Sequence, residues 1–151
     1  MNSTLLSKTE KQDLLTQLRE RFGIPAAAFH NKEFMKASKG RIFLVSEESV
    51  PFIDSLNPRA AGFLAARMHK TLKPSTNLLQ FVGNTITTNK IALTEAQFQD
   101  LNKWAETEST EATDGYVALF YRDICIGCGL KKGTSIKTMV PKGKRIPVTF
   151  L

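Results

Sequence analysis

Apolar residues in the first part of the chain recur at helical spacing between two well-marked ends. Ser7 followed by Glu10 fits a capping box, and Gly23 with Pro25 is typical of a helix end. The pattern predicts a helix over residues 7–23 with one apolar face, which must pack on another part of the chain. That face consists of Leu14, Leu15, Leu18 and Phe22.

The next segments alternate between a strand pattern and a helix pattern. Residues 42–45 are a short run of β-rich apolar types and predict a buried strand. Asn57 and Pro58 are typical of a helix start, which predicts a second helix with an apolar and a basic side. The apolar side would carry Ala60, Phe63, Leu64 and Met68, and the basic side Arg59, Arg67 and Lys70.

Four further elements are predicted between residues 77 and 105. Residues 77–82 indicate a short helix, and Ile86 and residues 91–93 indicate two short strands. Thr94 with Gln97 forms another capping box, which predicts a helix that follows it. Its inward face would hold Phe98, Leu101 and Ala105, and the acidic stretch 106–114 is expected to be a loop.

The last part of the chain has the pattern of a β-meander. Residues 116–121 predict a strand buried on both faces, and turns at 122–123, 131–133 and 141–143 separate three more strands. These would cover 124–130, 134–140 and 146–150, and such a meander usually forms one wall of a small barrel. The sequence thus predicts an α+β fold. A helix-rich N-terminal region with a short sheet (1–72) would pack on a C-terminal β-pseudo-barrel (73–151), and the two would share an apolar interface.

The positive charge of the chain is concentrated in this C-terminal part. The 151 residues carry 21 lysines and arginines against 14 acids. From Gly115 onward there are seven bases and one acid, whereas the preceding residues carry 14 bases and 13 acids. A basic patch with few acids is typical of a polyanion-binding surface, although it can also be a solubilising face.

No pattern in the sequence indicates catalysis, a metal or a cofactor. Cys125 and Cys128 have the spacing of a zinc or redox pair, but they fall in a strand, where residues three apart are expected on opposite faces. The only histidines, His30 and His69, lie far upstream, so we expect the cysteines to be small packing residues. We find no apolar run of membrane-spanning length and no secretory signal, which favours a cytoplasmic protein without membrane contact.

The bases near the C-terminus lie at predicted turns and strand ends among small residues. Small residues leave backbone N–H groups open to phosphate oxygens. Tyr116 and Tyr121 can stack on bases, although at least one of them is expected to pack in the core instead. Basic residues on a small barrel favour RNA over duplex DNA. The predicted RNA-binding residues are Arg59, Arg67, Lys73, Tyr116, Tyr121, Arg122, Lys131, Lys132, Lys137, Lys142, Lys144 and Arg145.

The same segment resembles a known RNA-binding domain. The stretch from Gly115 to Gly129, then Gly133, Lys137 and Pro141-Lys-Gly-Lys-Arg145, is similar to the PUA-like domain that ends many Nop/Sun-type RNA cytosine-5 methyltransferases. Upstream similarities lie at 21–25, 41–46, Arg59 with Gly62, and 73–80. The resemblance implies a PUA-like pseudo-barrel that docks on structured ribosomal or transfer RNA, in RNA modification or ribosome maturation.

The chain lacks the catalytic features of those methyltransferases. It has no glycine-rich S-adenosylmethionine loop and no Pro-Cys dipeptide. We therefore expect an RNA-docking module that is not an enzyme by itself and has no cofactor. It could be free-standing or part of a larger methyltransferase, and an RNA methyltransferase is a possible partner. The alternatives are a methyltransferase fragment or subunit with an unrecognised site, or an adaptor whose basic face binds an acidic protein.

Overall fold

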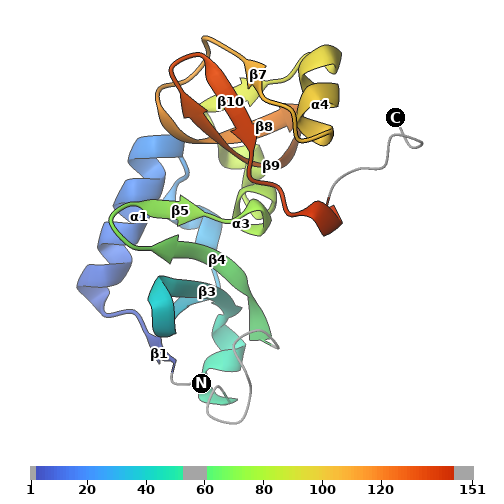
Figure 1. Cartoon of the computed structure of the whole chain (residues 1–151). Helices are drawn as coiled ribbons and strands as arrows, with labels where there is room; N and C mark the ends of the chain where they lie inside the picture. The colour runs from blue at the N-terminus through green and yellow to red at the C-terminus, as the bar shows by residue number, and fades with distance from the viewer. Residues whose placement is uncertain (1–2, 53–60, 145–151) are drawn as a thin grey trace.

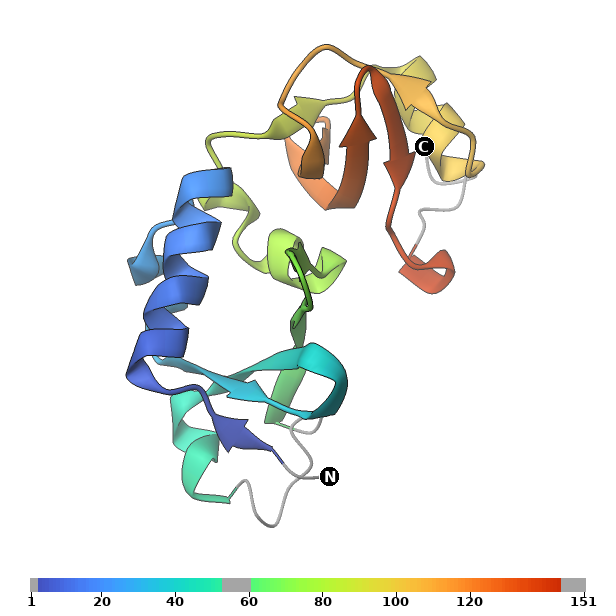
Figure 2. The ribbon, with the colours of Figure 1, turned by 60° about the vertical axis from the view of Figure 1, so that its left-hand side comes forward.

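The computed structural model describes residues 3–52 and 61–144. Within these ranges the chain is an α+β protein with two five-stranded sheets. The sheets occupy opposite ends of the molecule, and the second one curls around its own core (Figures 1 and 2). The first sheet is antiparallel, in the order β1 (Thr4–Leu5), β2 (Lys32–Lys36), β3 (Arg41–Ser46), β4 (Gly62–Met68) and β5 (Leu72–Pro74). The second has the order β6 (Lys90–Ala92), β8 (Gly115–Tyr121), β9 (Ile124–Lys132), β10 (Ser135–Thr138) and β7 (Thr107–Glu108).

Three α-helices with bounds inside residues 3–52 and 61–144 connect and cover these sheets. Helix α1 runs alongside the first sheet, and α3 lies between the two sheets (Figures 1 and 2). Short 3-10 helices fill several connections. The α-helices are α1 (Lys8–Phe22), α3 (Thr76–Phe81) and α4 (Glu95–Asn102), and the 3-10 helices are η1 (Ala26–Phe29), η2 (Ser38–Gly40), η3 (Glu47–Phe52), η4 (Gly83–Thr85) and η5 (Lys142–Lys144).

Helix α1 begins and ends where the sequence predicts. The Ser7 hydroxyl accepts a hydrogen bond from the Glu10 backbone N–H at 3.1 Å, and the Glu10 carboxylate accepts one from the Ser7 N–H at 2.9 Å. Lys36 on β2 donates to the same carboxylate, and together these bonds lower the pKa of Glu10 to about 2. Gly23 ends the helix in the left-handed conformation. The predicted capping box at Thr94 and Gln97 is also confirmed.

The predicted helix after Pro58 is wrong from Gly62 onward, although Ala61 has helical backbone. Residues 62–68 form β4, which pairs with β3 on one side and with β5 on the other. Gly62 suits this close pairing, because a Cβ there would overlap the Leu44 carbonyl oxygen. The helical preference of Leu, Ala and Met is overridden by the hydrogen bonds of a central strand. Asn57, Pro58 and Arg59 lie outside the described residues.

The N-terminal half therefore holds more sheet than the sequence indicates. The strand expected at 42–45 is confirmed within β3, but β1, β2 and β5 were not predicted. The half is built on five strands and one long helix rather than being helix-rich. The predicted boundary at residue 73 falls inside β5, which pairs with β4 of the first sheet.

The C-terminal meander is confirmed in β8, β9 and β10, which are antiparallel neighbours. Arg122 and Asp123 form the tight turn between β8 and β9, and both have positive φ. The predicted loop 106–114 includes the short strand β7, and Ile86 is buried without belonging to a strand. Ala105 lies beyond α4 and is exposed, which contradicts its predicted inward position. The predicted strand 146–150 lies outside the described residues.

One apolar core joins the two halves, as the sequence predicts. Leu18 on α1 and Leu78 on α3 are fully buried in the same cluster as Ala118 of β8 and Cys128 of β9. A second cluster fills the space between the second sheet and α4. Because the first cluster crosses from one sheet to the other, it fixes how the surfaces of the two halves face each other.

Candidate nucleic-acid interface

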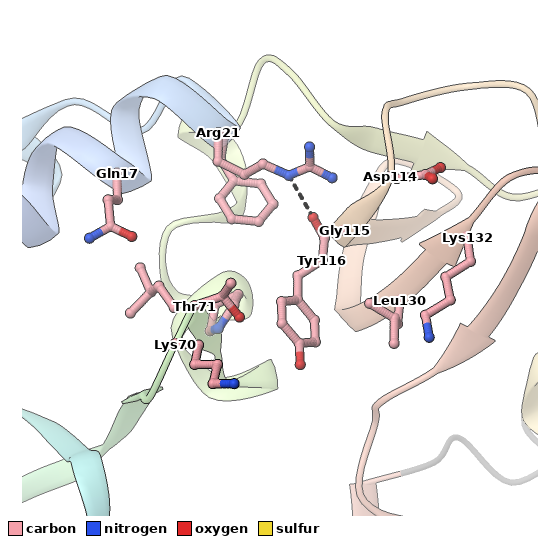
Figure 3. A pocket seen from close by; sticks show the side chains of 12 residues that line it. Gln17, Arg21, Lys70, Thr71, Asp114, Gly115, Tyr116, Leu130 and Lys132 are labelled. Atoms are coloured by element: carbon pink, nitrogen blue, oxygen red, sulfur yellow. Dashed lines mark hydrogen bonds between the residues drawn. The ribbon is translucent and has the colours of Figure 1, made fainter.

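A cleft of about 530 Å³ lies where the two halves meet. Its walls come from the C-terminal end of α1, the β4–β5 hairpin, and strands β8 and β9. Figure 3 shows the Tyr116 ring projecting into this space, with Lys70 on one side and Leu130 and Lys132 on the other. Gln17 and Thr71 add neutral hydrogen-bonding groups to the same walls. The cleft therefore combines the rings of Tyr116 and the buried Phe22 with cations from both halves.

A row of cations crosses the first sheet, and Lys73 at its end lies between Leu72 and Pro74, which line the cleft from the opposite face of β5. In the strand register, Arg41 of β3 lies directly opposite Arg67 of β4, and Arg67 lies directly opposite Lys73 of β5. Like charges in directly opposed positions destabilise a sheet. No hydrogen bond or ion pair in the described part of the chain engages the side chain of Arg67 or Lys73. The row is thus a concentration of positive charge, two members of which lack an anionic partner there.

The second sheet carries two exposed lysines on the face that also carries Tyr116. Leu130 of β9 lies opposite Tyr116 of β8 on one side and Lys137 of β10 on the other, so the three share one face. Lys132, two residues beyond Leu130, belongs to the same face, and both lysines are exposed. Because Tyr116 and Leu130 line the cleft, this face of the second sheet is the one turned towards the first half.

Two of the predicted RNA-binding residues are buried, which is a correction to the sequence analysis. Tyr121 is 7 % exposed and stacks on Phe98 at 4.1 Å between ring centroids, so it offers no open stacking surface. Lys131 is 6 % exposed; its ammonium donates to the Gly133 carbonyl oxygen and lies 3.8 Å from the Asp114 carboxylate. Both side chains point away from the face that carries Tyr116, because alternate residues of a strand face opposite sides.

The remaining predicted residues lie apart from the cleft or outside the described chain. Arg122 is exposed in the β8–β9 turn, with its guanidinium over the Tyr121 ring. Lys142 is exposed in η5, and Lys144 ends that element. Arg59 and Arg145 lie outside the described residues. The structure therefore brings Lys132, Lys137 and Tyr116 together on one face, and it places Arg67 and Lys73 in the row on the first sheet.

The sequence analysis did not assign Arg21, Lys70 or Arg41 to this region. Arg21 donates from Nε to the Tyr116 carbonyl oxygen at 2.9 Å and from Nη2 to the Thr113 carbonyl oxygen at 2.8 Å. Partial burial lowers the pKa of this guanidinium, against the opposing effect of Asp114. Arg21 thus ties α1 to the start of β8 and fixes the backbone that carries the Tyr116 ring. No local sequence signal marks such a contact between residues so far apart in the chain.

The two cysteines lie on the same face of β9, contrary to the sequence prediction. A bulge shifts the register, so that Cys125 pairs with Phe120 and Cys128 with Ala118, two positions apart on β8. Gly127 lies in this bulge with a φ of 147°, where a Cβ would be 2.6 Å from the Val140 side chain. Residues three apart in a regular strand face opposite sides, but the extra residue in the bulge brings both thiols to the same face. The prediction that these are packing residues agrees with their place in the core.

Both thiols are expected to be unreactive in the folded protein. Burial raises the pKa of Cys125 to about 11 and that of Cys128 to about 12, although the charge of Lys73 acts in the opposite direction on Cys128. The thiolate is the reactive form, so its population is very small at pH 8 and rises only as the pH approaches these values. A disulfide reagent at pH 8 should label neither thiol under native conditions and both in denaturant. Rapid labelling of one thiol in the native protein would contradict this arrangement.

No three His, Cys, Asp or Glu side chains in residues 3–52 and 61–144 come together as a metal site would require. Within the same ranges, no helix has the length and apolar character of a membrane-spanning segment.

The sequence matches no known protein-family model and no curated protein. The resemblance to the PUA-like domain of Nop/Sun-type methyltransferases therefore stays a prediction, alongside the geometry described above.

Proposed function

We propose that this chain binds structured RNA, ribosomal or transfer, as the docking module of an RNA-modification or ribosome-maturation process. The observation that carries the proposal is the cation row Arg41–Arg67–Lys73 across the first sheet. Like charges in register cost folding free energy, and an RNA backbone would offset that cost by placing phosphates along the row. Lys132 and Lys137 add exposed positive charge on the second sheet.

RNA is favoured over an acidic protein because an aromatic ring accompanies the cations. Tyr116 lies on the same face as Lys132 and Lys137. Proteins that bind unpaired RNA combine basic grooves with aromatic rings on which bases stack. An acidic polypeptide would form ion pairs with the cations, but its carboxylates would not stack on the aromatic ring. The resemblance to a PUA-like domain agrees with this choice, and an RNA methyltransferase acting alongside is part of the proposal.

The salt dependence of binding tests the proposal directly. Each phosphate that a protein cation neutralises contributes about 0.7 to 0.9 to the slope of log affinity against log salt. Replacing Arg67 and Lys137 together by alanine should weaken binding to a structured RNA and flatten that slope by about 1.5. The measurement is fluorescence anisotropy of a labelled RNA hairpin over a series of salt concentrations.

The matched control removes two cations that are already paired. Lys11 lies 3.1 Å from a carboxylate oxygen of Glu33, and Lys36 lies 2.8 Å from one of Glu10. The Lys11→Ala, Lys36→Ala protein loses the same charge and should keep the parent slope. Equal slopes for the parent and both variants would overturn the proposed surface. Displacement of the RNA by polyglutamate at equal charge concentration would instead indicate an acidic protein partner.

A further inference from the structure

The cleft between the two halves has the size and shape of a small-ligand site. At about 530 Å³ it falls within the range of pockets that hold ligands of nucleotide size. It is formed jointly by the two halves, which share one apolar core. Its dimensions are therefore fixed by the fold rather than by a single loop.

Besides the apolar side chains of Phe22, Leu72, Pro74 and Leu130, the cleft offers a ligand three kinds of group. Tyr116 supplies a half-buried aromatic ring, and none of the described residues hydrogen-bonds its hydroxyl. Lys70 and Lys132 are exposed cations on opposing walls, and no carboxylate in the described chain pairs with either (Figure 3). Gln17 and Thr71 supply neutral donors and acceptors.

Asp114 is the one acidic residue among the described residues that line the cleft, and its negative charge already has partners. The Asp114 carboxylate accepts a hydrogen bond from the Gly133 N–H at 2.9 Å, and the Lys131 ammonium lies 3.8 Å away. Its charge is therefore balanced by a buried lysine on the far side of β9. Lys70 and Lys132 are left to set the sign of the potential inside the cleft, and the nearby Arg21 guanidinium adds to it.

We propose that this cleft holds one unpaired nucleotide of the bound RNA. The base stacks on the Tyr116 ring, Lys70 and Lys132 contact the flanking phosphates, and Gln17 and Thr71 face the edge of the base. Unpaired nucleotides in bulges and loops are the parts of RNA that proteins stack on aromatic side chains. This inference rests on the proposed function, and it adds the class of RNA feature that the protein selects.

The test compares two RNA hairpins that differ in a single nucleotide. One is fully paired in its stem, and the other carries one bulged 2-aminopurine nucleotide. The parent protein should bind the bulged hairpin at least about fivefold more tightly, since stacking of one base on an aromatic ring contributes on this scale. The 2-aminopurine fluorescence should fall on binding as the base stacks.

Two substitutions at Tyr116 distinguish the loss of the aromatic ring from a general loss of folding. Tyr116→Leu should lose both the preference for the bulge and the fluorescence change, so that the variant binds the two hairpins with equal affinity. Tyr116→Phe keeps the ring and should keep both. Lys70→Met with Lys132→Met, at exposed positions where the fold is not at risk, should lower affinity for the bulged hairpin more than for the paired one.

The outcomes distinguish this inference from the proposed function. The nucleotide site is overturned if the parent binds the two hairpins equally and the Tyr116 variants keep the parent slope of log affinity against log salt. RNA binding itself would then remain supported. Failure of the parent to bind either hairpin would overturn both. A preference for the bulge that survives Tyr116→Leu would also overturn the role assigned to the ring.

Discussion

Replacing Leu18 by alanine is expected to lower the free energy of unfolding by about 2 to 5 kcal/mol. Leu18 is fully buried on α1, within the core cluster that also contains Leu78 and Ala118. Alanine removes apolar atoms and leaves a cavity that the surrounding core fills only in part. The measurement is urea denaturation followed by circular dichroism.

The same experiment tests whether the two halves unfold together. Leu5→Ala is the control, because Leu5 is 43 % exposed on the edge strand β1 and should change stability little. If the shared core couples the halves, Leu18→Ala shifts a single transition. Two separate transitions, with only the first moved by the substitution, would show that the halves are stable independently.

The elements that the sequence predicted well are those with local end signals. Ser7 with Glu10 and Thr94 with Gln97 form the capping boxes that begin α1 and α4, and Gly23 ends α1. The meander was recognisable because alternating apolar residues are separated by short turns. Such signals act between residues close together in the chain, so they can be read without knowledge of the fold.

The errors arose where distant parts of the chain decide the outcome. Residues 62–68 have helical composition, but they form a strand because β3 and β5 pair with it on both sides. The cysteines share a face because of a bulge, which the prediction of two-residue periodicity could not include. Tyr121 and Lys131 have residue types suited to RNA, yet they fall on the buried side of their strands.

The cleft could not be predicted as a unit for the same reason. Its lining comes from positions such as Gln17, Lys70, Tyr116 and Lys132, which are brought together only by the packing of the two halves. The sequence analysis selected Tyr116 and Lys132 from the charge and aromatic content of the C-terminal segment. Lys70 was predicted on the basic side of a helix with Arg59 and Arg67, and the β4–β5 turn that brings it beside Tyr116 was not predicted.

Replacing Arg21 by glutamine is expected to weaken the connection between α1 and the second sheet. The guanidinium donates to the carbonyl oxygens of Tyr116 and Thr113, and the Arg21 carbonyl oxygen accepts from the Asn89 side chain at 2.7 Å. Asn89 in turn accepts from the Thr113 N–H at 2.9 Å. Loss of the charged donor should lower the free energy of unfolding by about 2 to 3 kcal/mol, since hydrogen bonds to charged groups contribute on that scale.

Arg19→Gln is the matched control, because it removes the same charge from the same last turn of α1 at an exposed side chain. It should change the free energy of unfolding by less than about 0.5 kcal/mol. Arg21→Gln should also reduce the preference for the bulged hairpin, because the Tyr116 backbone loses the bond that fixes it beside Lys70. Equal stability of the two variants would contradict the structural role of Arg21. A reduced stability with an unchanged bulge preference would show that the remaining bonds of Thr113 and Asn89 are sufficient to hold β8 in place.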